Sequence, residues 1–291
     1  MSAARPFFLT LSQFARLTAA MTFVLLIAGG LVTSTDSGLS VPDWPLSYGG
    51  LFPPMVGGIR YEHTHRLIAG TVAILIFVLA ARLRRRESRR WVRGLGDAAA
   101  TAVLAQALLG GLTVIWLLPP AVSVAHACLG QTVFCLVVSI ALLTSRTWQT
   151  SSVGRPDAAL RRMAGATTAV IFVQLLLGAV IRHSGRGLPA HLVGAVTVST
   201  MVAVFAWRVR RSPARTPLLA AVAWIMALGV VGQLGLGLGV LGSRQAVAIT
   251  TAHVALGALI LASACMVTWL LCRAEGFFPL VSTSLATPEP A

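Results

Sequence analysis

Arg60-Tyr61-Glu62-His63-Thr64-His65-Arg66-Leu67-Ile68-Ala69-Gly70 is the stretch around which the sequence is organised. It places an acid, two imidazoles and two guanidinium groups at the start of a long apolar run. Ionisable groups at such a position are unfavourable in free energy and mark functional sites. Glu62 and His65 are three residues apart and share a helix face, whereas His63 points roughly 200° away from His65 at 3.6 residues per turn. We therefore expect a site that contains Glu62 and His65 but not His63.

The composition places this run in a membrane. Of the 291 residues, 56% are hydrophobic and 11% are charged, and the mean hydropathy is +0.83, which is too apolar for a soluble domain. Eight apolar runs are each long enough to cross a hydrocarbon core of ~30 Å. The sequence therefore predicts an all-α polytopic membrane protein with eight transmembrane helices. We expect the spans at approximately 14–33, 63–82, 97–117, 124–145, 160–181, 190–208, 217–240 and 247–272.

The positive charge of the chain indicates its orientation in the membrane. The formal net charge is +15, which in a soluble protein would suggest nucleic acid binding. Here all 23 cationic residues are Arg, and most of them lie in loops on one side of the predicted spans, above all in 82–93. Positive loops stay in the cytoplasm. We therefore expect a multi-pass protein of the cell (plasma) membrane with both termini cytoplasmic and no nucleic acid partner.

Histidines recur at the same place in the predicted helices. All six His residues fall on the outer half, and four of them begin the even-numbered spans, with intervals of 61, 65 and 62 residues: His65, His126, His191 and His253. The odd-numbered spans repeat as well, for example in Gln106-Ala107-Leu108-Leu109-Gly110-Gly111 and Gln174-Leu175-Leu176-Leu177-Gly178-Ala179. This pattern is a helical hairpin used four times, or a four-helix unit used twice.

A His at the same point of each repeat is expected to converge with the others on the interior of a helical bundle, where cofactor sites are found. We assign residues 1–150 to an N-terminal half, 151–276 to a C-terminal half, and 277–291 to a disordered cytoplasmic tail. Zinc sites need three or four protein ligands, whereas each half offers two His and a large apolar volume, which suits a haem with two axial imidazoles. A single His in a membrane helix is as often a packing residue, but four in register favour ligands.

The two other histidines have weaker assignments. His183 has no partner in the repeat, so an interface residue and a contact to a haem propionate both stay open. His63 is interpreted as peripheral.

These residues resemble the haem A synthases of the CtaA/Cox15 family, and the resemblance covers essentially the whole chain. Its most specific parts are the Glu62-x-x-His65-Arg66 cluster, the four helix-opening histidines and the loop Gly30-Leu31-Val32-Thr33-Ser34-Thr35-Asp36-Ser37-Gly38-Leu39-Ser40-Val41-Pro42-Asp43-Trp44-Pro45, where Asp36 replaces the first Gly of the family pattern. The resemblance implies eight transmembrane helices in two pseudo-symmetric halves. It also implies an enzyme that oxidises the C8 methyl group of haem O to a formyl group, giving haem A for terminal oxidases.

The resemblance implies roles for individual residues. His65 and His126 would be axial ligands of the substrate haem in the N-terminal half, and Glu62 would match the family's essential acid. A haem b cofactor in the C-terminal half would take its axial ligands from His191 and His253.

Two roles for Glu62 follow from its position. A carboxylate one turn from the ligand His65 could stabilise positive charge on the oxidised carbon or accept a proton from water. It could also complement the positive end of the helix and pair with Arg66, four residues on. Arg66 is itself a candidate for contact with a haem propionate, with a solvated rim charge as the alternative.

The cysteines depart from the family pattern. Many bacterial members carry a cysteine pair in the first outer loop, at positions that match Val41 and Ser47 here. The sequence therefore excludes a mechanism that passes electrons through a loop disulfide. Four cysteines fall within spans four and eight, and we interpret them as buried small hydrophobic residues: Cys128, Cys135, Cys265 and Cys272.

Three functions compete: an oxidoreductase that acts on haem O, a di-haem b membrane electron-transfer protein, and a haem transport or assembly protein. Histidines on the outer side alone argue against electron relay across the bilayer. An acid beside one pair only argues for two unequal sites, and a transporter would not need the second haem. We therefore expect the oxidoreductase, in a lipid bilayer, with haem O synthase (protohaem farnesyltransferase) as the upstream partner. The electron acceptor, the direct participation of O2 and a homo-oligomeric state are left open by the sequence.

Overall fold

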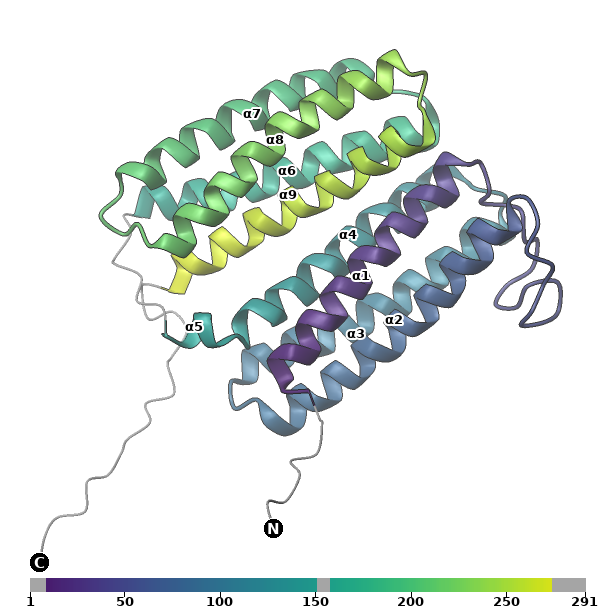
Figure 1. Ribbon diagram of the computed structural model, residues 1–291, viewed down its shortest axis with the longest axis horizontal. Helices are drawn as coiled ribbons and strands as arrows, with labels where there is room; N and C mark the ends of the chain where they lie inside the picture. The colour runs from purple at the N-terminus through teal and green to yellow at the C-terminus, as the bar shows by residue number, and fades with distance from the viewer. Residues whose placement is uncertain (1–8, 151–157, 274–291) are drawn as a thin grey trace, which may run out of the picture.

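The computed structural model describes residues 9–150 and 158–273, which form helices joined by loops (Figure 1). Eight helices in these ranges are long and apolar enough to cross a membrane, which confirms the predicted fold class. A further short helix, α5 (Arg146–Thr150), was not predicted. The long helices are α1 (Leu11–Ser34), α2 (Ile59–Arg86), α3 (Arg90–Ile115), α4 (Pro120–Leu143), α6 (Ala158–Ser184), α7 (Leu188–Arg211), α8 (Pro217–Gly242) and α9 (Val247–Arg273).

Helices extend past the predicted spans where Arg residues flank the apolar run. α2 continues to Arg86 and α3 begins at Arg90. Arg is a good helix former, and its aliphatic stem covers apolar surface while the charge stays in water. A helix therefore need not end where the hydrocarbon ends. Arg84 and Asp97 pair across this turn, with 2.8 Å between Nε and Oδ1.

The long helices form two four-helix bundles with the same pairing. In the first, α1 and α3 each pack against α2 and α4; in the second, α6 and α8 each pack against α7 and α9. The bundles meet where α1 and α4 contact α9 and where α4 contacts α6, and Figure 1 shows them side by side. This pairing is consistent with the predicted pseudo-symmetry. The predicted tail 277–291 lies outside the described residues.

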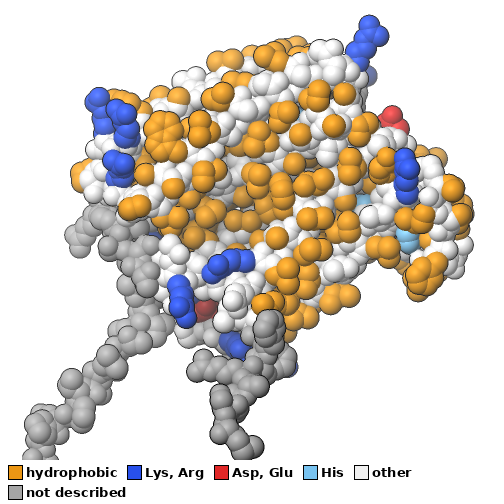
Figure 2. All heavy atoms as spheres, in the orientation of Figure 1, with side chains coloured by type: hydrophobic (Ala, Val, Ile, Leu, Met, Phe, Trp, Pro, Cys, Tyr) orange, Lys and Arg blue, Asp and Glu red, His pale blue; other side chains and the backbone are white. Residues whose placement is uncertain are grey.

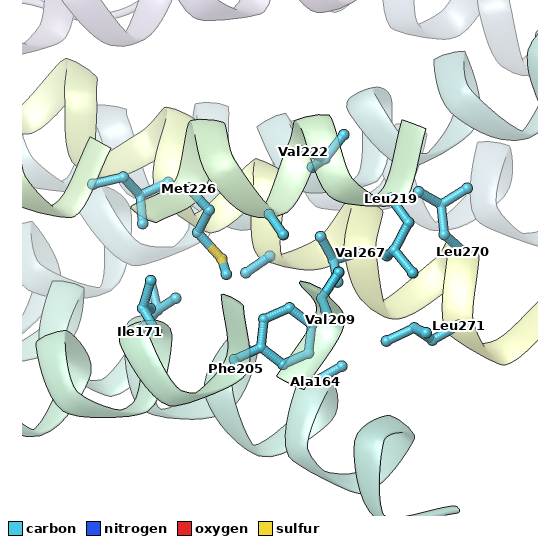
Figure 3. Packing of buried hydrophobic residues seen from close by; sticks show 14 of the residues in the cluster. Ala164, Ile171, Phe205, Val209, Leu219, Val222, Met226, Val267, Leu270 and Leu271 are labelled. Atoms are coloured by element: carbon cyan, nitrogen blue, oxygen red, sulfur yellow. The ribbon is translucent and has the colours of Figure 1, made fainter. Parts of the chain in front are cut away.

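The hydrophobic cores of both bundles lie at one end, away from the four histidines of the repeat. In the second bundle the core includes Phe205 of α7, Met226 of α8 and Leu270 and Leu271 of α9 (Figure 3). In the first bundle the core runs through the second half of α2 and of α4, including Leu83. The ends that carry the histidines lack these closely packed clusters, which leaves them suited to hold a ligand.

The outer flank of the bundles is apolar and their ends are charged. Large hydrophobic side chains are exposed on every long helix except α4, which packs against α1, α3, α6 and α9. Figure 2 shows them covering the visible flank, with the visible Arg side chains at the ends. This is the surface expected of a multi-pass membrane protein.

Polar contacts join the two bundles. Near the histidine-bearing end, Arg182 of α6 donates to the backbone oxygen of Thr33 of α1 at 2.5 Å. Near the opposite end, the indole N–H of Trp269 in α9 donates to Oγ of Ser139 in α4 at 2.9 Å.

The cysteines lie in α4 and α9, all in the free form. Cys135 is buried, as predicted, whereas Cys128, Cys265 and Cys272 are half-buried. Cys135 and Cys265 lie near each other across the α4–α9 contact, a proximity that the spacing within each helix did not indicate.

Candidate functional site

Each histidine of the repeat packs against a glycine of the preceding helix. A Cβ atom added to any of these glycines would press on Cε1 of the imidazole ring. Glycine therefore lets the ring lie directly on the helix backbone, and the sequence repeat corresponds to one structural unit built four times. The distances from the added Cβ to Cε1 are 3.2 Å for Gly29 and His65, 3.1 Å for Gly110 and His126, 3.2 Å for Gly178 and His191, and 3.3 Å for Gly237 and His253.

Three of the four units contain a glutamine that the sequence analysis did not assign to the site. Its side-chain amide lies one turn before the glycine and donates to the backbone oxygen of the histidine. In the unit of His65, Leu25 occupies this place. The repeated Gln in the odd-numbered spans was the signal for this contact. The three hydrogen bonds are Gln106 to His126 (2.9 Å), Gln174 to His191 (2.9 Å) and Gln233 to His253 (3.0 Å).

Two of the histidines of the repeat lie in each bundle. The rings of His191 and His253 lie edge to face, with their centroids 6.5 Å apart and their planes at 60°. That separation leaves room for one metal ion at about 2.0–2.1 Å from a nitrogen of each ring, the usual metal–imidazole distance. His65 and His126 occupy the equivalent places of the first bundle, on Gly29 of α1 and Gly110 of α3. Each bundle thus contains one imidazole pair.

The donor set of each pair fits a haem. In the described part of the chain, the buried Nδ1 atom of all four histidines has no hydrogen-bond partner, an uncommon state for a buried polar atom. No cluster of three or more His, Cys, Asp or Glu suited to a metal occurs within residues 9–150 and 158–273. Two imidazoles suffice as protein ligands for a haem, because the porphyrin supplies the other four nitrogens.

Glu62 is buried, with 4% of its surface exposed, and it is bound to the first outer loop. Its Oε1 forms the expected ion pair with Nη2 of Arg66, and its Oε2 accepts a hydrogen bond from the backbone N–H of Val41 at 2.8 Å. A carboxylate has about four acceptor sites, so it can still accept another donor. Glu62 therefore occupies the base of the loop that follows α1.

Arg66 is used to hold the same loop. Its Nη1 donates to the backbone oxygens of Asp43 (2.6 Å) and Leu46 (2.7 Å), and its Nη2 donates to that of Val41 (3.0 Å). Both terminal nitrogens are therefore occupied by the loop and Glu62. This arrangement argues against the propionate contact that we considered for Arg66.

His63 forms a second attachment of the loop. Its side chain is buried, and Nδ1 lies 2.9 Å from Oγ of Ser47. His63 thus binds Ser47, one of the two loop positions at which the resemblance described above implies cysteines. The other position, Val41, is bound by Glu62 and Arg66. Polar bonds to α2 hold the loop at both positions, which spacing along the chain did not reveal.

His183 lies at the interface of the two bundles. Its neighbour Arg182 reaches Thr33 of α1 and donates to Oε1 of Gln245 at 2.6 Å. Of the two open alternatives for His183, this position favours an interface residue.

Asp43 organises the tip of the loop, and this gives a prediction on pH. Its carboxylate accepts hydrogen bonds from the backbone N–H groups of Gly49 and Tyr48, each at 2.7 Å, and these bonds hold the pKa of Asp43 below its ordinary value of 3.8. Because folding lowers the pKa of Asp43, these bonds stabilise the loop at pH values above the ordinary pKa. The stabilisation is lost as the pH falls through the lowered pKa.

Hydrogen exchange of the peptide that contains Tyr48 and Gly49 checks this. Its protection factor should stay constant from pH 7 to about pH 4 and fall below that, near the reference pKa of Asp. In the Asp43→Ala variant, protection should already be low at pH 7. Equal protection of the variant and the parent at pH 7 would contradict this role of Asp43.

Comparison with known proteins connects this arrangement to one family. The family COX15-CtaA, described as "Cytochrome oxidase assembly protein", matches residues 12–57 and 59–191. The matched region includes the first outer loop and three of the four histidines of the repeat. It ends before His253.

Individual relatives are similar over shorter stretches. The chain is 29% identical over 177 residues to Heme A synthase of Geobacillus thermodenitrificans, 29% over 180 residues to that of Exiguobacterium sibiricum, and 40% over 96 residues to that of Lysinibacillus sphaericus. These matches cover 59%, 60% and 32% of this chain. They span 55%, 60% and 31% of the relatives' own length.

Proposed function

Because the chain belongs to the COX15-CtaA family of cytochrome oxidase assembly proteins, we propose that it is a haem A synthase, an oxidoreductase that converts the C8 methyl group of haem O into a formyl group. The observation that carries this proposal is the inequality of the two histidine pairs. The pair His65 and His126 has a buried acid and a loop of residues 35–58 beside it. The corresponding connection in the second bundle, between α6 and α7, is only residues 185–187.

We assign the substrate to the first bundle and a cofactor to the second. In this proposal His65 and His126 hold haem O in the half formed by residues 1–150. His191 and His253 hold a haem b in the half formed by residues 151–276. Haem b, when bound, would supply one-electron transfer. The glycine behind each ring fixes the orientation of the imidazole.

Glu62 is the proposed catalytic residue. Oxidation of the methyl group to an alcohol would take its oxygen atom from water and release two electrons and two protons. Oxidation of the alcohol to the aldehyde would release two more of each, and an external electron acceptor would take the electrons of both steps. Removal of electrons leaves positive charge on the reacting carbon. A buried carboxylate beside the His65 pair stabilises that charge, and it can accept a hydrogen bond from an incoming water. The ion pair with Arg66 keeps its position fixed.

The competing function of an electron carrier across the bilayer has less support. The four histidines of the repeat lie at one end of the bundles, and the described helices place the hydrophobic cores at the other end. A relay across the membrane would require redox groups at both ends. We propose that the histidine-bearing end faces outward and that the Arg-rich end faces the cytoplasm, in keeping with the distribution of positive charge. Haem O then reaches the first bundle through the lipid from a haem O synthase.

Expression in a cell that makes haem O but lacks its own haem A synthase tests the proposed function. Membranes of such cells should contain haem A when the chain is expressed, and none with an empty vector. A His65→Ala variant, expressed to the same level, should give no haem A. If the unchanged chain yields only haem O in several such hosts, the proposed reaction is wrong.

Thiol reductants should not affect this reaction. The loop carries Val41 and Ser47 where many family members carry cysteine, and it is held by Glu62, Arg66 and His63 instead. The rate of haem A formation by the purified protein should therefore be equal with and without dithiothreitol. Strong inhibition, under conditions that leave the redox state of the haems unchanged, would mean that a cysteine couple takes part after all.

A further inference from the structure

Trp44 of the first outer loop packs on α3 next to the glycine that supports His126. A Cβ atom added to Gly111 of α3 would lie 2.7 Å from Cδ2 and 2.9 Å from Cε2 of the indole. Gly110, the preceding residue, packs against the ring of His126. The indole therefore lies on the backbone of α3, one residue from the point where α3 supports His126.

The loop fixes Trp44 from both sides. Nη1 of Arg66 binds the backbone oxygens of Asp43 and Leu46, which bracket Trp44 in the chain. The carboxylate of Asp43 in turn binds the backbone of Tyr48 and Gly49. The side chain is thus positioned by bonds within a closed loop, and these bonds originate in the same Arg66 that pairs with Glu62.

The sequence repeat supports a specific role for this contact. In the first bundle the glycine that supports the histidine is followed by a second glycine, and each second glycine meets a neighbour: Gly111 meets Trp44, and Gly30 meets Thr251 of α9. In the second bundle the corresponding residues are Ala179 and Leu238. A glycine at position 111 of α3 therefore leaves the space that the indole of Trp44 occupies.

We propose that the loop of residues 35–58 is a lid and that Trp44 is a positioning residue, forming one wall of the porphyrin site between His65 and His126. This inference rests on the proposed function for the identity of the porphyrin. A large flat indole suits a porphyrin face, and a lid that stays closed would retain the alcohol until the second oxidation. The alternative is that Trp44, 39% exposed, serves as an anchor at the membrane interface.

Release of haem from the two sites of one protein tests this proposal. Purified protein is mixed with excess apomyoglobin, and the rates at which the two sites lose haem are compared. Trp44→Ala should speed release from the first site roughly tenfold, the equivalent of 1.4 kcal/mol, and leave release from the second site unchanged. It should also increase the fraction of product set free as the alcohol. Phe52→Ala is the matched control, because Phe52 lies in the same loop and is 94% exposed.

A double-variant cycle separates the lid from the stability of α3. Gly111→Ala should displace the indole and speed haem release from the first site, as Trp44→Ala does. The double variant should release haem from this site no faster than Trp44→Ala alone. The proposed lid is wrong if Gly111→Ala speeds haem release as much in the Trp44→Ala background as it does alone. It is also wrong if Trp44→Ala releases haem at the same rate as Phe52→Ala. Failure of the proposed function would appear differently, as absence of haem A from the unchanged protein, because the release rates report on whichever haem the first pair holds.

Discussion

Replacing Glu62 with Gln is expected to lower the haem A formed per haem-loaded protein by roughly 10²–10³-fold, equivalent to ~2.7–4 kcal/mol of barrier for the loss of one preorganised electrostatic contact. Gln keeps the shape of the side chain and can still accept the hydrogen bond from the Val41 N–H. It loses the negative charge beside the reacting carbon. The content of both haems should be nearly normal, and the alcohol should accumulate if the second oxidation suffers more.

The ion pair with Arg66 provides the control for this prediction. Arg66→Gln also breaks the pair, and it releases the loop, but it keeps the charge of Glu62. The catalytic role predicts that Glu62→Gln loses much more activity per bound haem than Arg66→Gln. If Glu62 only complements the end of α2 and pairs with Arg66, its loss should reduce stability by about 0.3–1 kcal/mol. Haem A formation would then continue at a near-normal rate in folded Glu62→Gln protein. That result would show that Glu62 is not a catalytic residue.

Replacing either His191 or His253 with Ala should abolish the low-spin spectrum of haem b. The two ring centroids lie 6.5 Å apart, so under the proposed assignment removal of one ring would leave the iron with a single protein ligand. Binding of haem at His65 and His126 should persist, because that pair lies in the other bundle. Electron paramagnetic resonance of the oxidised protein, together with the pyridine haemochrome spectrum, measures both sites.

His63→Ala is the matched control for these variants. His63 is buried and binds Ser47, but it lies outside both pairs, so its removal should keep the low-spin haem b signal intact. A full complement of bis-imidazole haem b in His191→Ala or His253→Ala would show that the second site is wrongly assigned.

Much of the fold followed from local properties of the sequence. Length and hydropathy predicted all eight long helices, because a span must satisfy its backbone hydrogen bonds within itself and cover a fixed thickness. The ends were less accurate wherever Arg residues continued the helix into water, as at Arg86 and Arg90. The contacts between glycine and histidine were implicit in the repeat, because residues at equivalent positions of repeated hairpins make equivalent contacts.

The loop contacts followed from no local pattern. Ser47 meets His63 across 16 residues, and Trp44 meets Gly111 of a different helix, so the chain gives no periodic signal for either contact. Arg66 illustrates the same limit: its spacing from Glu62 predicted their ion pair, but its bonds to Asp43 and Leu46 depend on how a proline-rich loop folds back. The sequence therefore indicated the polar cluster of Glu62, His65 and Arg66, whereas the contacts between this cluster and the loop depend on tertiary structure.

Identification of the haems extracted from the purified protein tests the central claim most directly, which is that the chain holds two different haems in two unequal sites. Chromatography of the acid–acetone extract should give haem b together with haem O, its alcohol or haem A, in nearly equal total amounts. His65→Ala should lose the second group of haems and keep haem b. An extract that contains only haem b, at two per chain, would contradict the account and identify a di-haem b protein.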